Sequence, residues 1–211
     1  MKPEAYKLIE PDSAPTEPIT LAEAKYQLKV DHDDDDDYIT SLITAAREFC
    51  EEHTGRSFVP QTWQLGFAGW PQAKFWEWAD FKPEFQLVRP PVFSVNHIKY
   101  RANGASSLTT LDASKYTFDP DVLPGIVRFK SSVTLPSLNE DYSAPVQVTI
   151  TCGTSDESNT AAAIPARVKL AMKQMLTQFY DNRTPVVTGT IASSVPLTAL
   201  DLLARYKIRK A

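Results

Sequence analysis

Hydrophobic residues recur at helical spacing between residues 20 and 58. Thr20 and Glu23 form a capping-box pattern, in which each side chain bonds the backbone of the other residue, so a short helix over about 21–29 is predicted to follow. A longer helix is predicted over about 35–53 and ends at Gly55, because glycine commonly lies just beyond a helix end. Its apolar stripe, with i, i+3, i+4, i+7 spacing, consists of Ile39, Leu42, Ile43, Ala46, Phe49 and Cys50.

Between residues 61 and 153 the pattern changes to alternation, which predicts β-strands. Trp63, Leu65 and Phe67 alternate with polar or small residues, and Asn103-Gly104 is a strong signal for a hairpin turn. The predicted strands cover residues 62–67, 95–101, 108–111, 116–118, 126–129 and 146–151. Short strands separated by prolines and hairpin turns indicate an antiparallel β-region.

Helical spacing returns after residue 163. Pro165 suits the first position of a helix, and an apolar stripe then continues to Asp181. A last short helix is predicted over about 196–206, before a basic end. Residues 1–19 are rich in proline and are predicted to form an extended arm without a regular element.

The order of helices, strands and helices predicts an α+β fold. We expect the N- and C-terminal helices to pack as a small bundle, with the antiparallel β-region inserted between them. The 211 residues are expected to form one domain. Its parts are an extended arm (1–19), a helical part (20–58), the β-region (61–153), a second helical part (164–206) and a basic tail (207–211).

Composition narrows the classes of function. The net charge of −4 argues against a dedicated nucleic-acid binder, which needs a basic surface to neutralise phosphates. Cys50 and Cys152 fit no zinc spacing and are expected to be buried. Because no apolar run is long enough for a signal peptide or a membrane span, we expect a soluble protein made in a reducing cytoplasm, without membrane contact.

Residues 31–37 place six aspartates and His32 directly before the longer helix. A calcium loop beginning at Asp31 needs glycine at its sixth position and glutamate at its twelfth, where this chain has Asp36 and Leu42. We therefore interpret the run as the charged start of a helix, with one of Asp33 to Asp35 as the N-cap residue. A divalent-cation-binding module that uses Asp31 to Asp37 is the alternative.

No motif of a catalytic or cofactor site is present. The three histidines are isolated, and seven glycines supply little material for a phosphate-binding loop. We therefore predict that the chain is not an enzyme and has no catalytic residue, cofactor or resident metal. Aromatic residues crowd the stretch from Trp70 to Phe85, and two interpretations remain open: a core beneath a loop, or a contact between subunits.

The densest match to a known family runs from Glu17 to Ile39 and includes the acidic run. Further matching stretches cover residues 45–58, 61–63, 87–92, 94–95, 124–128, 146–153 and 164–183. Taken in this order and spacing, the sequence resembles the head–tail connector (head-completion adaptor) proteins of long-tailed bacteriophages and their prophage relatives. The resemblance spans most of the chain.

This resemblance implies a structural protein that forms a ring, typically twelvefold, below the portal. Such a ring extends the channel through which DNA passes without sequence-specific binding, and it receives the stopper or tail-completion protein. The expected location is the head–tail junction of the virion, after assembly in the host cytoplasm. The family's portal contact maps onto Leu197, Leu200, Leu203, Arg205, Tyr206, Lys207, Arg209 and Lys210. Candidates for contacts between subunits are Asp33, Asp34, Asp36, Trp70, Trp76 and Trp78.

Overall fold

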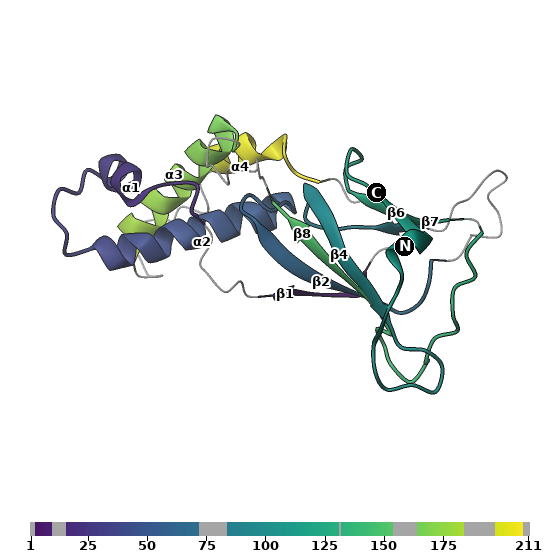
Figure 1. Cartoon of the computed structure of the whole chain (residues 1–211). Helices are drawn as coiled ribbons and strands as arrows, with labels where there is room; N and C mark the ends of the chain where they lie inside the picture. Colours follow the sequence, from purple (N-terminus) through teal and green to yellow (C-terminus); the bar gives the residue numbers. More distant parts are fainter. Residues whose placement is uncertain are drawn as a thin grey trace. The chain divides into compact units, whose positions relative to one another are not determined.

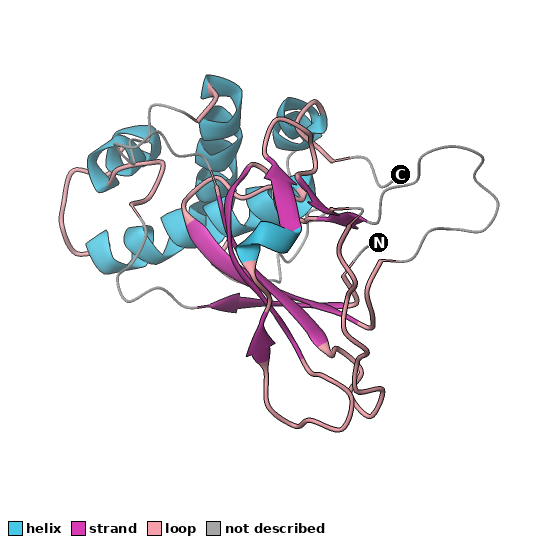
Figure 2. Cartoon of the chain, turned by 45° about the vertical axis from the view of Figure 1, so that its right-hand side comes forward, coloured by secondary structure: helices cyan, strands magenta, loops and turns pink. Residues whose placement is uncertain are grey.

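The computed structural model has a mixed α+β fold, as predicted (Figure 2). It describes residues 3–9, 16–71, 84–130, 132–153, 164–183 and 197–208. The chain divides into two compact units. A β-unit is formed by Met1–Ala14 with Pro60–Gly153, and a helical unit is formed by Pro15–Val59 with Thr154–Ala211.

The helical unit contains four α-helices within the described residues (Figure 1). Their bounds are α1 Leu21–Leu28, α2 Asp36–Thr54, α3 Ala166–Asp181 and α4 Leu197–Ala204. The predicted capping box is present, since Thr20 Oγ1 accepts from the Glu23 amide at 3.2 Å and Glu23 Oε2 accepts from the Thr20 amide at 3.1 Å. Gly55 ends α2 with a φ of 71°, and its N–H donates to the Glu51 carbonyl. Pro165 is the N-cap residue of α3 and not its first helical residue, so the helix begins one residue later than predicted.

All four helices of this unit contribute to one hydrophobic core. Helix α3 packs against α2, α1 and α4, so the stripe predicted from periodicity is the surface that is buried. Phe58 packs back onto this core after α2 ends at Gly55. The buried members are Ile19, Ala24, Ile39, Ile43, Ala46, Cys50, Phe58, Ile164, Val168, Ala171, Met172, Met175, Leu176, Ala199 and Leu203.

The β-unit contains two antiparallel sheets, one with the strand order β1-β2-β8-β4-β5 and one with the order β3-β7-β6. Figure 1 shows β2, β8 and β4 side by side in the larger sheet. The strands are β1 Ala5–Ile9, β2 Gln61–Phe67, β3 Glu84–Gln86, β4 Val92–Tyr100, β5 Thr109–Thr110, β6 Tyr116–Asp119, β7 Ile126–Phe129 and β8 Val146–Cys152. A short 3₁₀ helix, η1 (Ala113–Lys115), precedes β6. The predicted turn at Asn103-Gly104 is present, with Gly104 at a φ of 73°.

Strand β1 corrects the prediction that residues 1–19 form no regular element. Residues Ala5 to Ile9 pair with β2, from Ala5 opposite Gly66 to Ile9 opposite Thr62. All five side chains of β1 are exposed, so local sequence offers no alternating pattern of buried residues. Pairing with β2, far along the chain, makes this segment a strand.

The core of the β-unit is rich in aromatic side chains. Phe85 is completely buried, and its ring centroid lies 4.0 Å from that of Phe67 and 5.5 Å from that of Phe129. Phe67 belongs to the larger sheet, and Phe85 and Phe129 belong to the smaller one, so the two sheets share one hydrophobic core. Cys152 is buried here and Cys50 in the helical core, as expected, and burial raises the pKa of the Cys50 thiol to about 12.

Candidate functional site

Asp35 lies at the predicted N-cap position of α2, but its carboxylate has a different role. Among the described residues it makes no side-chain hydrogen bond to the first turn of the helix. Its Oδ2 instead accepts from Tyr180 Oη at 2.6 Å and from Arg183 Nη2 at 2.9 Å. Asp35 is therefore the N-cap residue, as predicted, and its carboxylate joins the start of α2 to the end of α3 instead of bonding to the first turn.

Arg183 completes this cluster by lying over two aromatic rings. Its guanidinium carbon is 4.6 Å from the ring centroid of Tyr38 and 4.9 Å from that of Tyr180. Such contacts add a cation–π attraction to the ion pair with Asp35. The hydrogen bond from Tyr180, assisted by Arg183, holds the pKa of the Asp35 carboxyl below its ordinary value.

Lys25 of α1 forms ion pairs with two further carboxylates of the run. Its Nζ lies 2.6 Å from Asp33 Oδ1 and 2.8 Å from Asp36 Oδ1. The hydrogen bond from Lys25 lowers the pKa of Asp33, and its bonds to Asp33 and Asp36 raise the pKa of Lys25. Two of the three predicted subunit-contact aspartates thus have partners within the unit, whereas the side chain of Asp34 is 95% exposed.

Three aspartates of the run are therefore paired with two cations, because Asp33 and Asp36 share Lys25 and Asp35 binds Arg183. Within the described ranges, no three His, Cys, Asp or Glu side chains gather closely enough to hold a metal ion. Lys25, Tyr180 and Arg183 donate hydrogen bonds to carboxylate oxygens that a divalent-cation site would need as ligands. The geometry favours the interpretation of a helix start that is tied into the core over that of a cation-binding loop.

Replacing Asp35 by asparagine is expected to lower the melting temperature at neutral pH, because Arg183 then loses its counter-charge. A carboxyl whose pKa is lowered by folding stabilises the native state above its unfolded pKa, and this contribution disappears as the pH falls through the folded pKa. The variant should therefore lose less stability than wild type between about pH 5 and pH 2. Asp34→Asn is the matched control, and equal melting curves for both variants would contradict the role of Asp35.

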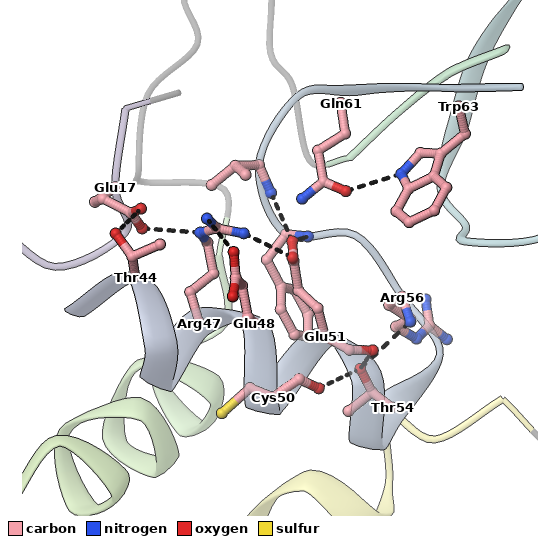
Figure 3. Close-up of polar contacts among 12 residues, drawn as sticks. Glu17, Thr44, Arg47, Glu48, Cys50, Glu51, Thr54, Arg56, Gln61 and Trp63 are labelled. Carbon is pink, nitrogen blue, oxygen red and sulfur yellow. Dashed lines mark hydrogen bonds and ion pairs between the residues drawn. The ribbon is translucent and has the colours of Figure 1, made fainter. Parts of the chain in front are cut away.

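A second polar cluster is buried on α2 and has Arg47 at its centre (Figure 3). Arg47 Nε lies 2.9 Å from Glu17 Oε2, and Nη1 lies 2.8 Å from Glu51 Oε2. Glu17 also accepts from Thr44 Oγ1 at 2.9 Å, and the exposed Glu48 lies 3.7 Å from Arg47 Nη2. Sequence analysis missed this cluster, although the i, i+4 spacing of Arg47 and Glu51 was a usable signal.

This cluster holds both ends of the N-terminal stretch of the helical unit. Glu17 lies near its beginning at Pro15, and Glu51 Oε1 accepts from the Phe58 amide at 2.6 Å and the Val59 amide at 3.4 Å near its end. The buried guanidinium of Arg47 binds the carboxylates of Glu17 and Glu51, and it therefore fixes the beginning and the end of this stretch.

The predicted portal-binding residues fall into three groups. Leu203 is completely buried in the helical core, and Leu200 is half-buried. Tyr206 is half-buried, and Arg205 and Lys207 are exposed beyond α4. The side chain of Leu197, together with Arg209 and Lys210, lies outside the described residues.

Trp70 belongs to the core rim of the β-unit. Its indole N–H donates to the Pro136 carbonyl at 2.7 Å, and its ring lies 5.7 Å from Tyr100 and 5.6 Å from Phe129 between centroids. This favours the interpretation of a core beneath a loop for Trp70. Trp76 and Trp78 lie outside the described residues.

The stretch with the acidic run and the Arg47 cluster also carries a recognisable family signature. Residues 18–77 match the model of the phage gp6-like head-tail connector protein family. The resemblance to head–tail connectors seen in the sequence is thereby confirmed. The family match includes α1, α2 and β2, with Lys25, Arg47 and Glu51 among its residues.

Solved structures resemble the chain over almost its whole length. A chain in the neck of an empty GTA particle, computed with C6 symmetry, aligns with a TM-score of 0.71 and 18% identity, covering 97% of both chains. A chain in the neck of the native GTA particle, computed with C12 symmetry, has a TM-score of 0.71 and 16% identity, again with 97% of both chains covered. A chain of the virion of the native gene transfer agent has a TM-score of 0.70 and 19% identity, over 97% of this chain and 96% of that one.

The likeness to the GTA chains shows a shared fold over almost the whole chain, and the family match covers residues 18–77. No match was found among curated proteins. None of the helices that the structure describes has the length and apolar character needed to cross a membrane.

Proposed function

We propose that this protein is a structural adaptor of a phage head–tail junction. It forms a ring below the portal, extends the DNA channel and receives the stopper or tail-completion protein. The main support is a fold shared over 97% of the chain with a neck protein of a GTA particle, together with the family match at residues 18–77. The helices act as a small bundle that carries the portal contact, and the chain performs no catalysis.

The ring consists of twelve copies in the virion, by analogy with the GTA neck computed with C12 symmetry. A closed ring needs two different surfaces on each subunit, because its contacts are heterologous. The exposed Asp34 at the start of α2 and the aromatic residues Trp76 and Trp78 remain our candidates for these surfaces. Trp70 is a weaker candidate, because it packs against the core of the β-unit. Asp33 and Asp36 are weaker as well, because they already share Lys25 as an ion-pair partner.

The portal contact is made by the basic residues beyond α4. Arg205 and Lys207 are exposed there, and Arg209 and Lys210 extend the basic sequence. Because Leu203 is buried in the helical core, we assign it a structural role. Helix α4 then holds the portal contact in position, and the residues that follow α4 bind the portal.

DNA passes through the ring without sequence-specific binding. The net charge of −4 supports this, because a surface that does not neutralise phosphates leaves the duplex free to slide. The protein assembles in the host cytoplasm and ends at the head–tail junction of the virion.

The decisive experiment mixes the protein with the portal of the same particle and examines the complex by electron microscopy. We expect rings on the portal, and we expect Arg205→Glu with Lys207→Glu to weaken portal binding at least tenfold, equivalent to about 1.4 kcal/mol. Arg167→Glu, which reverses an exposed charge on α3, is the control for altered net charge. Monomers without affinity for the portal would overturn the proposed function.

A further inference from the structure

The residues that follow α4 are attached to the end of α2. Arg56 Nε donates to the Tyr206 carbonyl at 2.6 Å, and the Ile208 amide donates to the Thr54 carbonyl at 2.8 Å. We call Tyr206, Lys207 and Ile208 the C-terminal segment. Two hydrogen bonds, one of them from a guanidinium, thus fix the stretch that follows α4.

The end of α2 has a shape that accepts this segment. Gly55 adopts a left-handed conformation with a φ of 71°, which turns the chain away from the helix axis. A Cβ at Gly55 would lie 3.8 Å from the Ile208 Cβ, so Ile208 lies directly over the turn. The Tyr206 side chain packs against the helical core at the same time.

Electrostatics favours the same arrangement. The carboxyl end of a helix carries a partial negative charge, which attracts cations. Lys207 lies near this end of α2, where burial and the charge of Lys207 together lower the pKa of His53. Burial also lowers the pKa of Arg56, so its partly desolvated guanidinium has a strong need for an acceptor such as the Tyr206 carbonyl.

We infer that Arg56 is a positioning residue for portal binding: its hydrogen bond to Tyr206 holds the C-terminal segment on α2 so that Lys207 is presented in one arrangement. This inference rests on the proposed function. If a partner binds only one conformation of a flexible segment, its measured affinity falls in proportion to the fraction of molecules in that conformation. Arg56 therefore raises portal affinity without touching the portal itself.

The test compares portal affinity and the amide hydrogen exchange of Ile208, measured by NMR, in wild type, Arg56→Ala, Arg56→Lys and Arg167→Ala. Arg56→Ala is expected to speed exchange at Ile208 and to weaken portal binding about tenfold, the loss expected for a charged hydrogen bond. Arg56→Lys keeps a cationic donor and should restore part of the slow exchange at Ile208 and part of the portal affinity. Arg167→Ala loses the same charge on α3 and should match wild type.

Ile208→Pro provides an independent check, because it removes the amide donor to Thr54 and keeps Arg56. Weaker portal binding by this variant and by Arg56→Ala, with circular dichroism spectra unchanged, supports the inference. Wild-type affinity in Arg56→Ala, or wild-type affinity in Ile208→Pro, overturns it. Failure of the proposed function is distinguishable, because then wild type itself does not bind the portal.

Discussion

Replacing Arg47 by alanine is expected to lower the free energy of unfolding of the helical unit by about 3–5 kcal/mol, because it leaves the buried carboxylate of Glu51 without its cation. Arg47 is 5% exposed and Glu51 3% exposed, so water does not replace the lost partner. Chemical denaturation followed by far-ultraviolet circular dichroism, which is dominated by the helices, measures the loss. The attachment of Glu17 should weaken as well, since Arg47 binds it directly.

Glu48→Ala is the matched control on the same helix. Its carboxylate also lies near Arg47, at 3.7 Å, but its side chain is 66% exposed, so the loss should stay within about 1 kcal/mol. The double variant Arg47→Met with Glu51→Gln is expected to lose less than the two single variants added together, because it leaves no buried charge unpaired at Glu51. Strict additivity would show that the two residues stabilise the unit independently.

Replacing Phe85 by alanine is expected to destabilise the β-unit by about 3–5 kcal/mol through the cavity that it leaves. Phe85 is completely buried and contacts Phe67 and Phe129 across the two sheets. The loss can be followed by tryptophan fluorescence, since all four tryptophans of the chain lie in the stretch Pro60–Gly153. Phe85→Leu keeps much of the volume and should cost less.

The control for the loss of an apolar side chain in the same unit is Leu123→Ala, where the residue is 55% exposed and the change should stay within about 0.5 kcal/mol. An effect of Phe85→Ala as small as that of Leu123→Ala would show that the smaller sheet, with β3, does not depend on this contact. It would also argue against a shared core for the two sheets.

The elements with strong periodic patterns were predictable from the sequence. Helices α2 and α3 each bury one continuous stripe, and β2 and β8 alternate clearly, so local patterns located them. Strand β1 was not predictable, because its residues are exposed and its partner strand lies far along the chain. Strand β3 has three residues, too few for a periodic signal.

The functional clusters were less accessible to sequence analysis, because their members are far apart in the chain. Tyr180 and Asp35 are separated by 145 positions, and Arg56 and Tyr206 by 150. The acidic run was visible in the sequence as six aspartates in seven positions, but its partners, Lys25, Tyr180 and Arg183, depend on how the helices pack. Family resemblance gave the functional class, whereas the Arg47 cluster required side-chain positions.

The helical core is assembled from two stretches that are synthesised far apart in time. Helices α1 and α2 emerge early, with their apolar stripes exposed, and α3, which covers them, is made only after the whole β-unit. Translation at about 5–20 residues per second leaves these stripes uncovered for several seconds. The nascent chain is therefore a natural client for chaperones, and the Arg47 cluster, which needs only residues up to Val59, can form during this interval.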